Sequence, residues 1–186
     1  LLFVRRPLFI AHQTWITNPD GTTGSLHWLK RLLLRRATSF AISGAIAGSL
    51  PVASIRIGNP YDDHVFKDSL AAAKKRELIF VGRLVSDKGA SLLLDALKLI
   101  TTKPRLTIVG DGPERAALEK QTADSGLQAQ VDFAGSLHGD RLAAALREHE
   151  ILVVPSLWQE PFGIVALEGI ACGCVVIGSA GGGLGE

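Results

Sequence analysis

Two glutamates with seven residues between them are the most informative feature of this sequence. Glu160 is followed by Pro161 and Gly163, and an apolar run then leads to Glu168. The apolar stretch 151–154 predicts a buried strand just upstream, so the segment reads strand, loop and helix. Glu160 is expected in the loop and Glu168 about two turns inside the helix. Both carboxylates could then accept hydrogen bonds from sugar hydroxyls. Taken alone, two solvated glutamates on a surface helix would explain the pattern better.

The start of this predicted helix could also bind an anion. Pro161 suits a first helical turn, where its missing N–H is no loss. The amides of Phe162, Gly163 and Ile164 are then predicted to lack helical partners and to point toward a phosphate.

A second strand–loop–helix segment carries two cations. Residues 78–82 predict a strand that ends at Gly82, Arg83 and Lys88 follow in the loop, and 92–97 form an apolar helical run. Two cations at the carboxyl end of a parallel strand are well placed to neutralise a diphosphate. For either cation alone, a solvated loop residue is the simpler interpretation.

Four motifs occur in an order that resembles a known family. They are Phe80-Val-Gly-Arg-Leu with Lys88-Gly89, Ile108-Val-Gly-Asp-Gly-Pro-Glu114, Val131-Asp-Phe-Ala-Gly135 and Glu160 to Glu168. Together they are similar to the signatures of retaining glycosyltransferases of the GT-B fold, in glycosyltransferase family 4 (glycosyl transferases group 1). The resemblance covers about residues 1–186. It implies transfer of a hexose from a nucleotide diphosphate sugar to a glycan, lipid-linked or small-molecule acceptor.

The resemblance also implies roles for individual residues. Glu160 would bind hydroxyls of the transferred sugar near its anomeric carbon without acting as a nucleophile, and Glu168 would hold the ribose. The residues expected to take part in catalysis are Glu160, His12, Arg83 and Lys88. Those expected to bind substrate are Glu168, Phe162, Gly163, Ile164, Gly82, Gly110 and Asp111. No metal and no cofactor are expected, since the sequence has no Asp-x-Asp pair suited to magnesium.

Two of these assignments have alternatives. A lone histidine such as His12 is more often structural, although its place at the end of an apparent parallel strand favours a role at the site. The loop at Gly110 and Asp111 suggests a dinucleotide fingerprint, but Arg115 replaces its third glycine. A tight turn beside the donor is the better interpretation.

The alternation of patterns predicts an α/β protein with a doubly wound parallel sheet, a Rossmann-like C-terminal domain of GT-B type. Strands are expected at 78–82, 105–109, 131–134, 151–154 and 174–178, and helices at 88–100, 113–125, 138–148 and 162–172. Before them, the sequence predicts a strand at 8–11, a loop at 18–24, a helix at 26–36 capped by Ser25, a short helix, and segments at 39–43 and 54–57.

We place the domain boundary within residues 60–77. Residues 1–66 would be the tail of an acceptor-binding domain that is incomplete, and residues 67–186 a nucleotide-sugar-binding domain with a truncated end. We therefore expect residues 1–186 alone to be inactive. Val175 and Gly185 stand where the family usually has proline, which affects loop rigidity more than chemistry.

Composition narrows the class of protein. With 186 residues, 47% of them hydrophobic, the chain can bury a core, and it has no apolar run near the ~20 residues that span a bilayer. The N-terminus lacks the order of a signal peptide. Cys172 and Cys174 have neither the Cys-x-x-Cys spacing of redox motifs nor the spacing of zinc ligands. The sequence has no dense basic patch that would predict nucleic-acid binding.

The first 66 residues hold seven basic and three acidic side chains. Lys30, Arg31, Arg35 and Arg36 alternate with apolar residues there, as in helices that dock on anionic membranes. A surface helix with its core face at Leu26, Leu29 and Leu33 is the favoured alternative. We expect a cytoplasmic protein, with contact to the inner face of the membrane left open.

Two other functions are compatible with the same sequence motifs. One is a catalytically silent donor-binding subunit that regulates a partner transferase. The other is a sugar-nucleotide epimerase of the same fold, which would release free nucleotide and an altered sugar without an acceptor.

Overall fold

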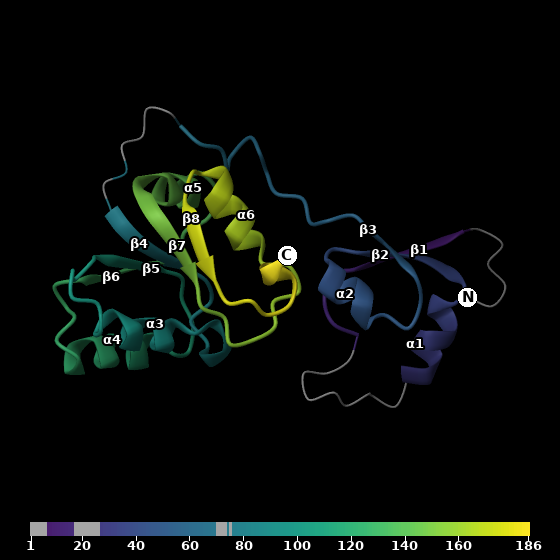
Figure 1. Cartoon of the computed structure of the whole chain (residues 1–186), viewed down its shortest axis with the longest axis horizontal. Coiled ribbons are helices and arrows are strands. Elements are labelled where there is room, and N and C mark those ends of the chain that lie inside the picture. The colour runs from purple at the N-terminus through teal and green to yellow at the C-terminus, as the bar shows by residue number, and fades with distance from the viewer. Residues whose placement is uncertain (1–6, 17–26, 70–73, 75) are drawn as a thin grey trace. The chain divides into compact units, whose positions relative to one another are not determined.

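The computed structural model describes residues 7–16, 27–69, 74 and 76–186 (Figure 1). The chain forms two compact units. The N-terminal unit comprises residues up to Pro60, with Gln159–Phe162 and Gly182–Glu186; the C-terminal unit comprises Tyr61–Trp158 and Gly163–Gly181. The chain thus first leaves the N-terminal unit after residue 60, within the range of 60–77 in which the sequence analysis placed the boundary. The loop predicted at 18–24 and the cap at Ser25 lie outside the described residues.

The N-terminal unit is built on a parallel sheet of order β1-β2-β3. Its elements are β1 (Leu8–His12), α1 (His27–Leu34), β2 (Ala37–Ala41), α2 (Gly44–Ser49) and β3 (Ser54–Arg56). Ala41, Ile42 and Ile46 form its buried core, and Trp15 and Phe162 pack against them. Phe162 therefore contributes to the core of the N-terminal unit from a segment far along the chain.

Helix α1 presents the core face that the sequence predicted in part, since Leu33 is half-buried. Leu34 is buried, whereas Leu29 is 36% exposed, and Leu26 lies outside the described residues. Trp28 and Leu32 are also exposed, at 65% and 40%. The helix is shorter than predicted and ends at Leu34, because strand β2 begins only three residues later.

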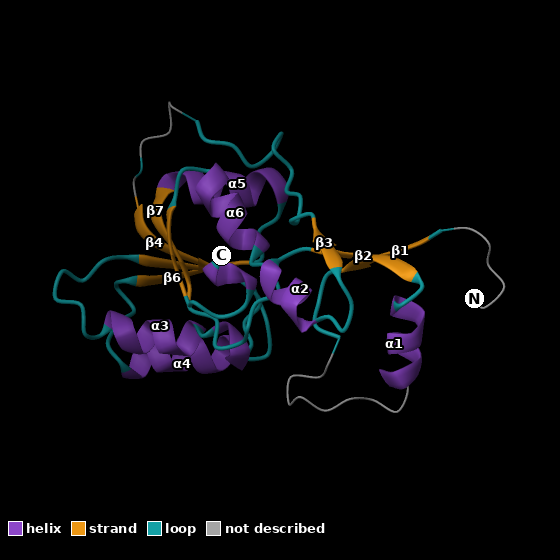
Figure 2. Cartoon of the chain, turned by 45° about the vertical axis from the view of Figure 1, so that its right-hand side comes forward, coloured by secondary structure: helices purple, strands orange, loops and turns teal. Residues whose placement is uncertain are grey.

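The C-terminal unit is a five-stranded parallel sheet of order β6-β5-β4-β7-β8. The strands are β4 (Arg76–Val81), β5 (Leu106–Val109), β6 (Val131–Gly135), β7 (His149–Val154) and β8 (Val175–Gly178). The helices are α3 (Ala90–Leu97), α4 (Arg115–Asp124), α5 (Gly139–Glu148) and α6 (Ile164–Ala171), with short 3₁₀ turns η1 (Ser86–Lys88) and η2 (Gly183–Gly185), the latter in the N-terminal unit. Helices α3 and α4 cover one face of the sheet and α5 and α6 the other (Figures 1 and 2). The predicted doubly wound α/β fold is confirmed.

Burial on both faces explains the apolar strands. All four residues of β5 are buried, and Phe80 and Ile79 of β4 are 2% and 0% exposed. One face packs on Leu94 and Leu97 of α3. Because both faces exclude water, these strands lack the alternation of a half-exposed sheet.

Helices α3 and α6 each begin two residues later than the sequence predicted, and glycine is the reason in both. Gly163 has φ 86° and ψ 54°, a left-handed conformation outside the helical region, so α6 begins at Ile164. Pro161 is therefore not in the first turn of α6, and that expectation was wrong. Gly89 has φ 73° and separates the turn η1 from α3.

Two of the sequence-based exclusions concern features that the structure describes. Within the described residues, no helix is both long and apolar enough to cross a membrane. Cys172 and Cys174 are both buried free thiols, and burial raises the pKa of each. The Cys174 thiol donates to the Leu146 carbonyl at 3.1 Å, which is consistent with a structural role.

Candidate functional site

The strand order creates a switch point beside the central strand. From β4 the chain moves outward to β5 and β6, and it then returns to pair β7 with the other edge of β4. In doubly wound sheets, ligands bind outside the carboxyl ends of the strands at such a point. The loops that follow β4 and β7 therefore form the candidate site of the C-terminal unit.

Backbone hydrogen bonds tie these two loops together. The carbonyl of Asp87 accepts from the amides of Leu157 and Trp158, at 2.8 and 3.2 Å. Gly89 lies so close to the same loop that an added Cβ would sit 2.0 Å from the Pro155 carbonyl oxygen. The Lys88-Gly89 pair is thus fixed in place by the loop after β7.

The loop after β5 is joined to the loop after β4 in the same way. The amide of Leu84 donates to the Asp111 carbonyl at 2.9 Å. Gly110 has φ 139°, and a Cβ there would lie 1.8 Å from the Gly82 carbonyl oxygen. The Asp111 carboxylate accepts from the Gly112 amide at 2.7 Å and pairs with Arg115 at 3.6 Å. Gly82, Gly110 and Asp111 therefore shape the loops, as the tight-turn interpretation predicted.

Arg83 and Lys88, the two cations that the sequence analysis identified, lie on the loop after β4. Arg83 is exposed and Lys88 is half-buried, at the two ends of a segment that also carries Asp87. The guanidinium and the ammonium are the groups that bind phosphate oxygens best, one as a fork and the other as a point charge. The loop carries a net positive charge at the edge of the sheet where an anionic ligand would bind.

Helix α6 places the second glutamate of the pair. Glu168 lies in the second turn of α6, about half a turn closer to the start of the helix than predicted, because the helix begins at Ile164 rather than at residue 162. It is half-buried, and burial raises the pKa of its carboxyl group. The amide of Ala166 already donates to the Gly163 carbonyl at 2.9 Å, so within the first turn the amides of Ile164 and Val165 are the ones left for an anion.

The first glutamate lies in the N-terminal unit. Glu160 forms a parallel bridge with Gly182, and its carbonyl accepts from the Gly183 amide at 2.7 Å. The Trp15 indole donates to the carbonyl of the preceding residue, Gln159, at 3.0 Å. Phe162 belongs to the core of this unit. The backbone of Glu160 is thus held by contacts of the residues before and after it as well as by its own bond to Gly183.

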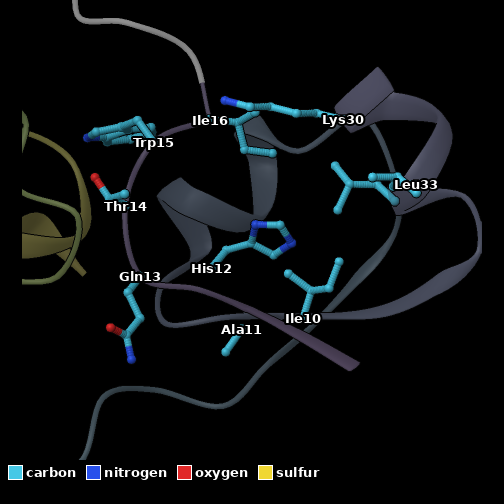
Figure 3. Close-up of a pocket in the computed structure, with 10 residues that line it drawn as sticks. Ile10, Ala11, His12, Gln13, Thr14, Trp15, Ile16, Lys30 and Leu33 are labelled. Carbon is cyan, nitrogen blue, oxygen red and sulfur yellow. The ribbon is translucent and has the colours of Figure 1, made fainter. Parts of the chain in front are cut away.

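His12 lines a pocket of about 320 Å³ in the N-terminal unit (Figure 3). It is the last residue of β1, is 9% exposed, and its Nε2 lies 3.3 Å from the Ser39 hydroxyl. Burial lowers the pKa of the imidazole, so the neutral form is favoured. Figure 3 shows the ring among Ile10, Ile16 and Leu33, with Lys30 at the rim. The pocket is largely apolar and has a titratable group in its wall.

The described residues contain no group of three or more His, Cys, Asp or Glu side chains that could hold a metal ion. Sequence reasoning missed one support in the C-terminal unit, the Asp87 carbonyl, and two in the N-terminal unit, the Trp15 indole and the Ser43 hydroxyl, which accepts from Ile46 at the start of α2. Only Ser43 had a signal, since serine before an apolar helical run is a typical N-cap.

Comparisons with known proteins identify the family to which the chain is similar. The family model described as "Glycosyl transferases group 1" matches residues 62–186. An uncharacterized glycosyltransferase of Methanocaldococcus jannaschii is 39% identical over 114 residues, which are 60% of this chain and 29% of that protein. Glycogen synthase of Mycobacterium tuberculosis is 40% identical over 113 residues, which are 59% of this chain and 27% of that enzyme.

Solved structures extend the likeness to nearly the whole chain. HepE of Anabaena, in complex with UDP and glucose, superposes with a TM-score of 0.79 at 26% identity, over 96% of this chain and 54% of HepE. Sucrose-phosphate synthase of Thermosynechococcus elongatus gives a TM-score of 0.77 at 24% identity, over 95% of this chain and 51% of that enzyme. The chain therefore spans about half of these structures and under a third of the two curated relatives. The fold is the GT-B fold that the motifs predicted.

Proposed function

Because the chain belongs to the glycosyl transferases group 1 family, we propose that its full-length protein is a retaining, metal-independent glycosyltransferase of family 4. It transfers a hexose from a nucleotide diphosphate sugar to a glycan, a lipid-linked acceptor or a small molecule. The acceptor would be one used in polysaccharide biosynthesis.

The observation that carries the proposal is the loop with Arg83 and Lys88 at the switch point of the parallel sheet. Its cations lie at the edge where doubly wound sheets bind nucleotides. The ties from Asp87 to the loop after β7 hold it in one conformation. Preorganised cations stabilise the charge that develops on a departing diphosphate without having to rearrange during the reaction.

In this proposal the two glutamates have separate roles. Glu168 accepts hydrogen bonds from the ribose hydroxyls, and Glu160 binds hydroxyls of the transferred sugar. His12 contacts the donor sugar and its phosphate, and its neutral form can accept or donate a hydrogen bond there. These roles rest on the family resemblance together with the position of each residue.

The bond that breaks joins the anomeric carbon of the sugar to an oxygen of the distal phosphate. The bond that forms joins the same carbon, on the same face, to the acceptor hydroxyl oxygen. The proton of that hydroxyl passes to a phosphate oxygen of the departing nucleoside diphosphate. Arg83 and Lys88 offset the negative charge that the diphosphate gains.

Calorimetry with bare nucleoside diphosphates tests the site map. UDP is the first probe, with GDP and ADP as the others, because HepE was solved with UDP. Replacing Arg83 or Lys88 by alanine should weaken binding roughly ten- to hundredfold, since hydrogen bonds to charged groups contribute about 1.5–3 kcal/mol. Arg105→Ala is the matched control. Arg105 immediately precedes β5, so it lies at the amino ends of the strands, whereas the candidate site lies at their carboxyl ends. EDTA should leave binding unchanged.

The glutamates give the sharper arm of the test. The Glu168→Gln variant should bind UDP more weakly than the parent protein. The Glu160→Gln variant should bind UDP with normal affinity but transfer sugar poorly. The assignment of the site residues is wrong if Glu160→Gln loses as much UDP affinity as Lys88→Ala, or if EDTA abolishes UDP binding by the parent protein.

A further proposal concerns the membrane. Helix α1 exposes Trp28, Leu29 and Leu32 beside Lys30 and Arg31, a combination typical of helices that lie on anionic bilayers. This would bring a cytoplasmic enzyme to a lipid-linked acceptor at the inner face of the membrane. Co-sedimentation with anionic but not with neutral vesicles supports it, and loss of binding in Trp28→Ser would assign it to α1.

A further inference from the structure

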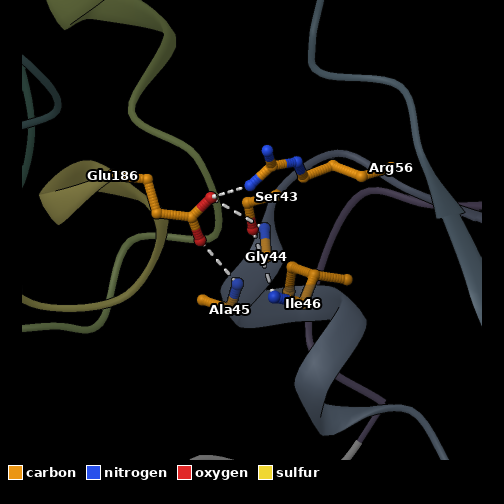
Figure 4. Close-up of polar contacts among 6 residues, drawn as sticks. All are labelled: Ser43, Gly44, Ala45, Ile46, Arg56 and Glu186. Atoms are coloured by element: carbon orange, nitrogen blue, oxygen red, sulfur yellow. Dashed lines mark hydrogen bonds and ion pairs between the residues drawn. The ribbon is translucent and has the colours of Figure 1, made fainter.

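The Glu186 carboxylate contacts three partners within the N-terminal unit (Figure 4). Its carboxylate accepts from the Gly44 amide at 2.8 Å and from the Ala45 amide at 2.6 Å. The Arg56 guanidinium lies 3.3 Å from the same carboxylate. These three partners hold the carboxylate ionised and lower the pKa of Glu186.

The anchor on which Glu186 rests is itself fixed. Ser43 is 1% exposed and caps α2, accepting from the Ile46 amide at 3.1 Å. Ile46 is completely buried in the core of the unit. Figure 4 shows the Glu186 carboxylate pointing at the start of α2, with Arg56 reaching it from β3. Glu186 is therefore attached to a capped helix start that leads directly into the buried core of the unit.

The residues just before Glu186 contact the Glu160 segment. Gly182 bridges to Glu160, and the Gly183 amide donates to the Glu160 carbonyl at 2.7 Å. The fit is close, because a Cβ on Gly182 would lie 2.2 Å from the Glu160 carbonyl oxygen, and one on Gly183 would lie 2.4 Å from that of Pro161. Displacing the Gly182–Gly183 turn would therefore displace the Glu160 backbone.

We infer that Glu186 is a positioning residue. By anchoring the Gly182–Gly183 turn on α2, it fixes the backbone from which the Glu160 carboxylate extends toward the transferred sugar. The catalytic part of this inference rests on the role proposed above for Glu160. The anchoring itself does not, so the two can be tested separately.

Glu186→Gln in the full-length protein removes the charge and leaves one acceptor oxygen for two amides. Its NH₂ group would face a backbone amide or Arg56, both of which are donors. Amide exchange at Gly183 should become roughly tenfold faster or more, because charge-assisted hydrogen bonds are the strong ones. Glu77→Gln is the matched control, since the Glu77 carboxylate also accepts a backbone amide, that of Arg105 at 3.0 Å, within the C-terminal unit.

Kinetics with the nucleotide sugar supply the second readout. The kcat of Glu186→Gln should fall about tenfold while UDP affinity and the KM for the donor stay within about twofold, because the contact acts only through Glu160. In the Glu160→Gln background, Glu186→Gln should cause almost no further loss, as expected when two residues act through one contact.

Three results would overturn parts of the inference. Unchanged exchange at Gly183 would show that Glu186 does not hold the turn. Losses from Glu186→Gln and Glu160→Gln that multiply in the double variant would show that Glu186 does not act through Glu160. If the parent protein transfers no sugar, the proposed function fails and the catalytic part of the inference fails with it, while the exchange result still decides the anchoring.

Discussion

Replacing Gly89 by alanine should damage both stability and nucleotide binding. The φ of 73° at Gly89 is left-handed, which costs an alanine about 1–2 kcal/mol. Alanine also restricts the unfolded chain, which offsets about 0.4–1 kcal/mol of that cost. These two effects alone leave a net destabilisation of about 1 kcal/mol.

The larger effect comes from the Pro155 carbonyl. A Cβ at 2.0 Å from that oxygen cannot be accommodated by a side-chain rotation, because the oxygen belongs to the backbone. The loops must separate, which breaks the bonds from Leu157 and Trp158 to the Asp87 carbonyl. Each such bond contributes about 1 kcal/mol net. The total for Gly89→Ala is then about 3 kcal/mol.

Gly126→Ala is the matched control for this estimate. Gly126 has φ 67°, but nothing lies within 4 Å of an added Cβ. It should lose only the conformational part, about 1 kcal/mol. Urea denaturation followed by circular dichroism measures both variants, and UDP titration should show at least a roughly tenfold weaker affinity for Gly89→Ala alone, because Lys88 moves with its neighbour. Equal destabilisation of the two variants would refute the argument from the Pro155 contact.

Two further predictions concern histidines. His12→Ala in the full-length protein should lower turnover at least about tenfold with UDP affinity nearly unchanged, since contact with the donor sugar is lost and contact with the nucleotide is not; equal turnover in variant and parent would return His12 to a structural role. Burial lowers the pKa of His149, whose ring bonds the Thr107 hydroxyl at 2.8 Å and the Ala145 carbonyl at 2.7 Å. The folded state therefore binds fewer protons than the unfolded state, so this contribution to stability is complete above pH ~6.5 and is lost as the pH falls below it. As the pH falls below about 6.5, the melting temperature of His149→Gln should decline less than that of the parent protein. An equal decline in both proteins would show that His149 does not cause this pH dependence.

The order of elements could be predicted because it depends on local patterns. Apolar runs marked all five strands of the C-terminal unit, and the structure has Arg83 and Lys88 after the carboxyl end of β4, as the sequence predicted. The starts of α3 and α6 could not be predicted from helical propensity. They depend on Gly89 and Gly163, which both adopt left-handed conformations outside the helical region.

The supports of the site were less accessible to sequence reasoning. The tie from Asp87 to Leu157 uses only backbone groups, which every residue carries, so no residue type signals it. The motif from Glu160 to Glu168 reads as one helix and its loop, yet Phe162 packs against the core cluster of Ala41, Ile42 and Ile46 from the N-terminal part of the chain. Contacts between residues so far apart leave no periodic pattern in either segment.

The strand order has a consequence for synthesis of the protein. Strand β4 is central, and its register joins Phe80 to Val153, far along the chain. While a ribosome is still translating the residues before β7, one edge of β4 has no partner strand, and the apolar side chains of β4 have only part of their cover. Such non-local parallel pairing is slow and prone to aggregation. The sheet can therefore form completely only after β7 has been synthesised, and protection of the nascent chain by a chaperone should matter most between the emergence of β4 and that of β7.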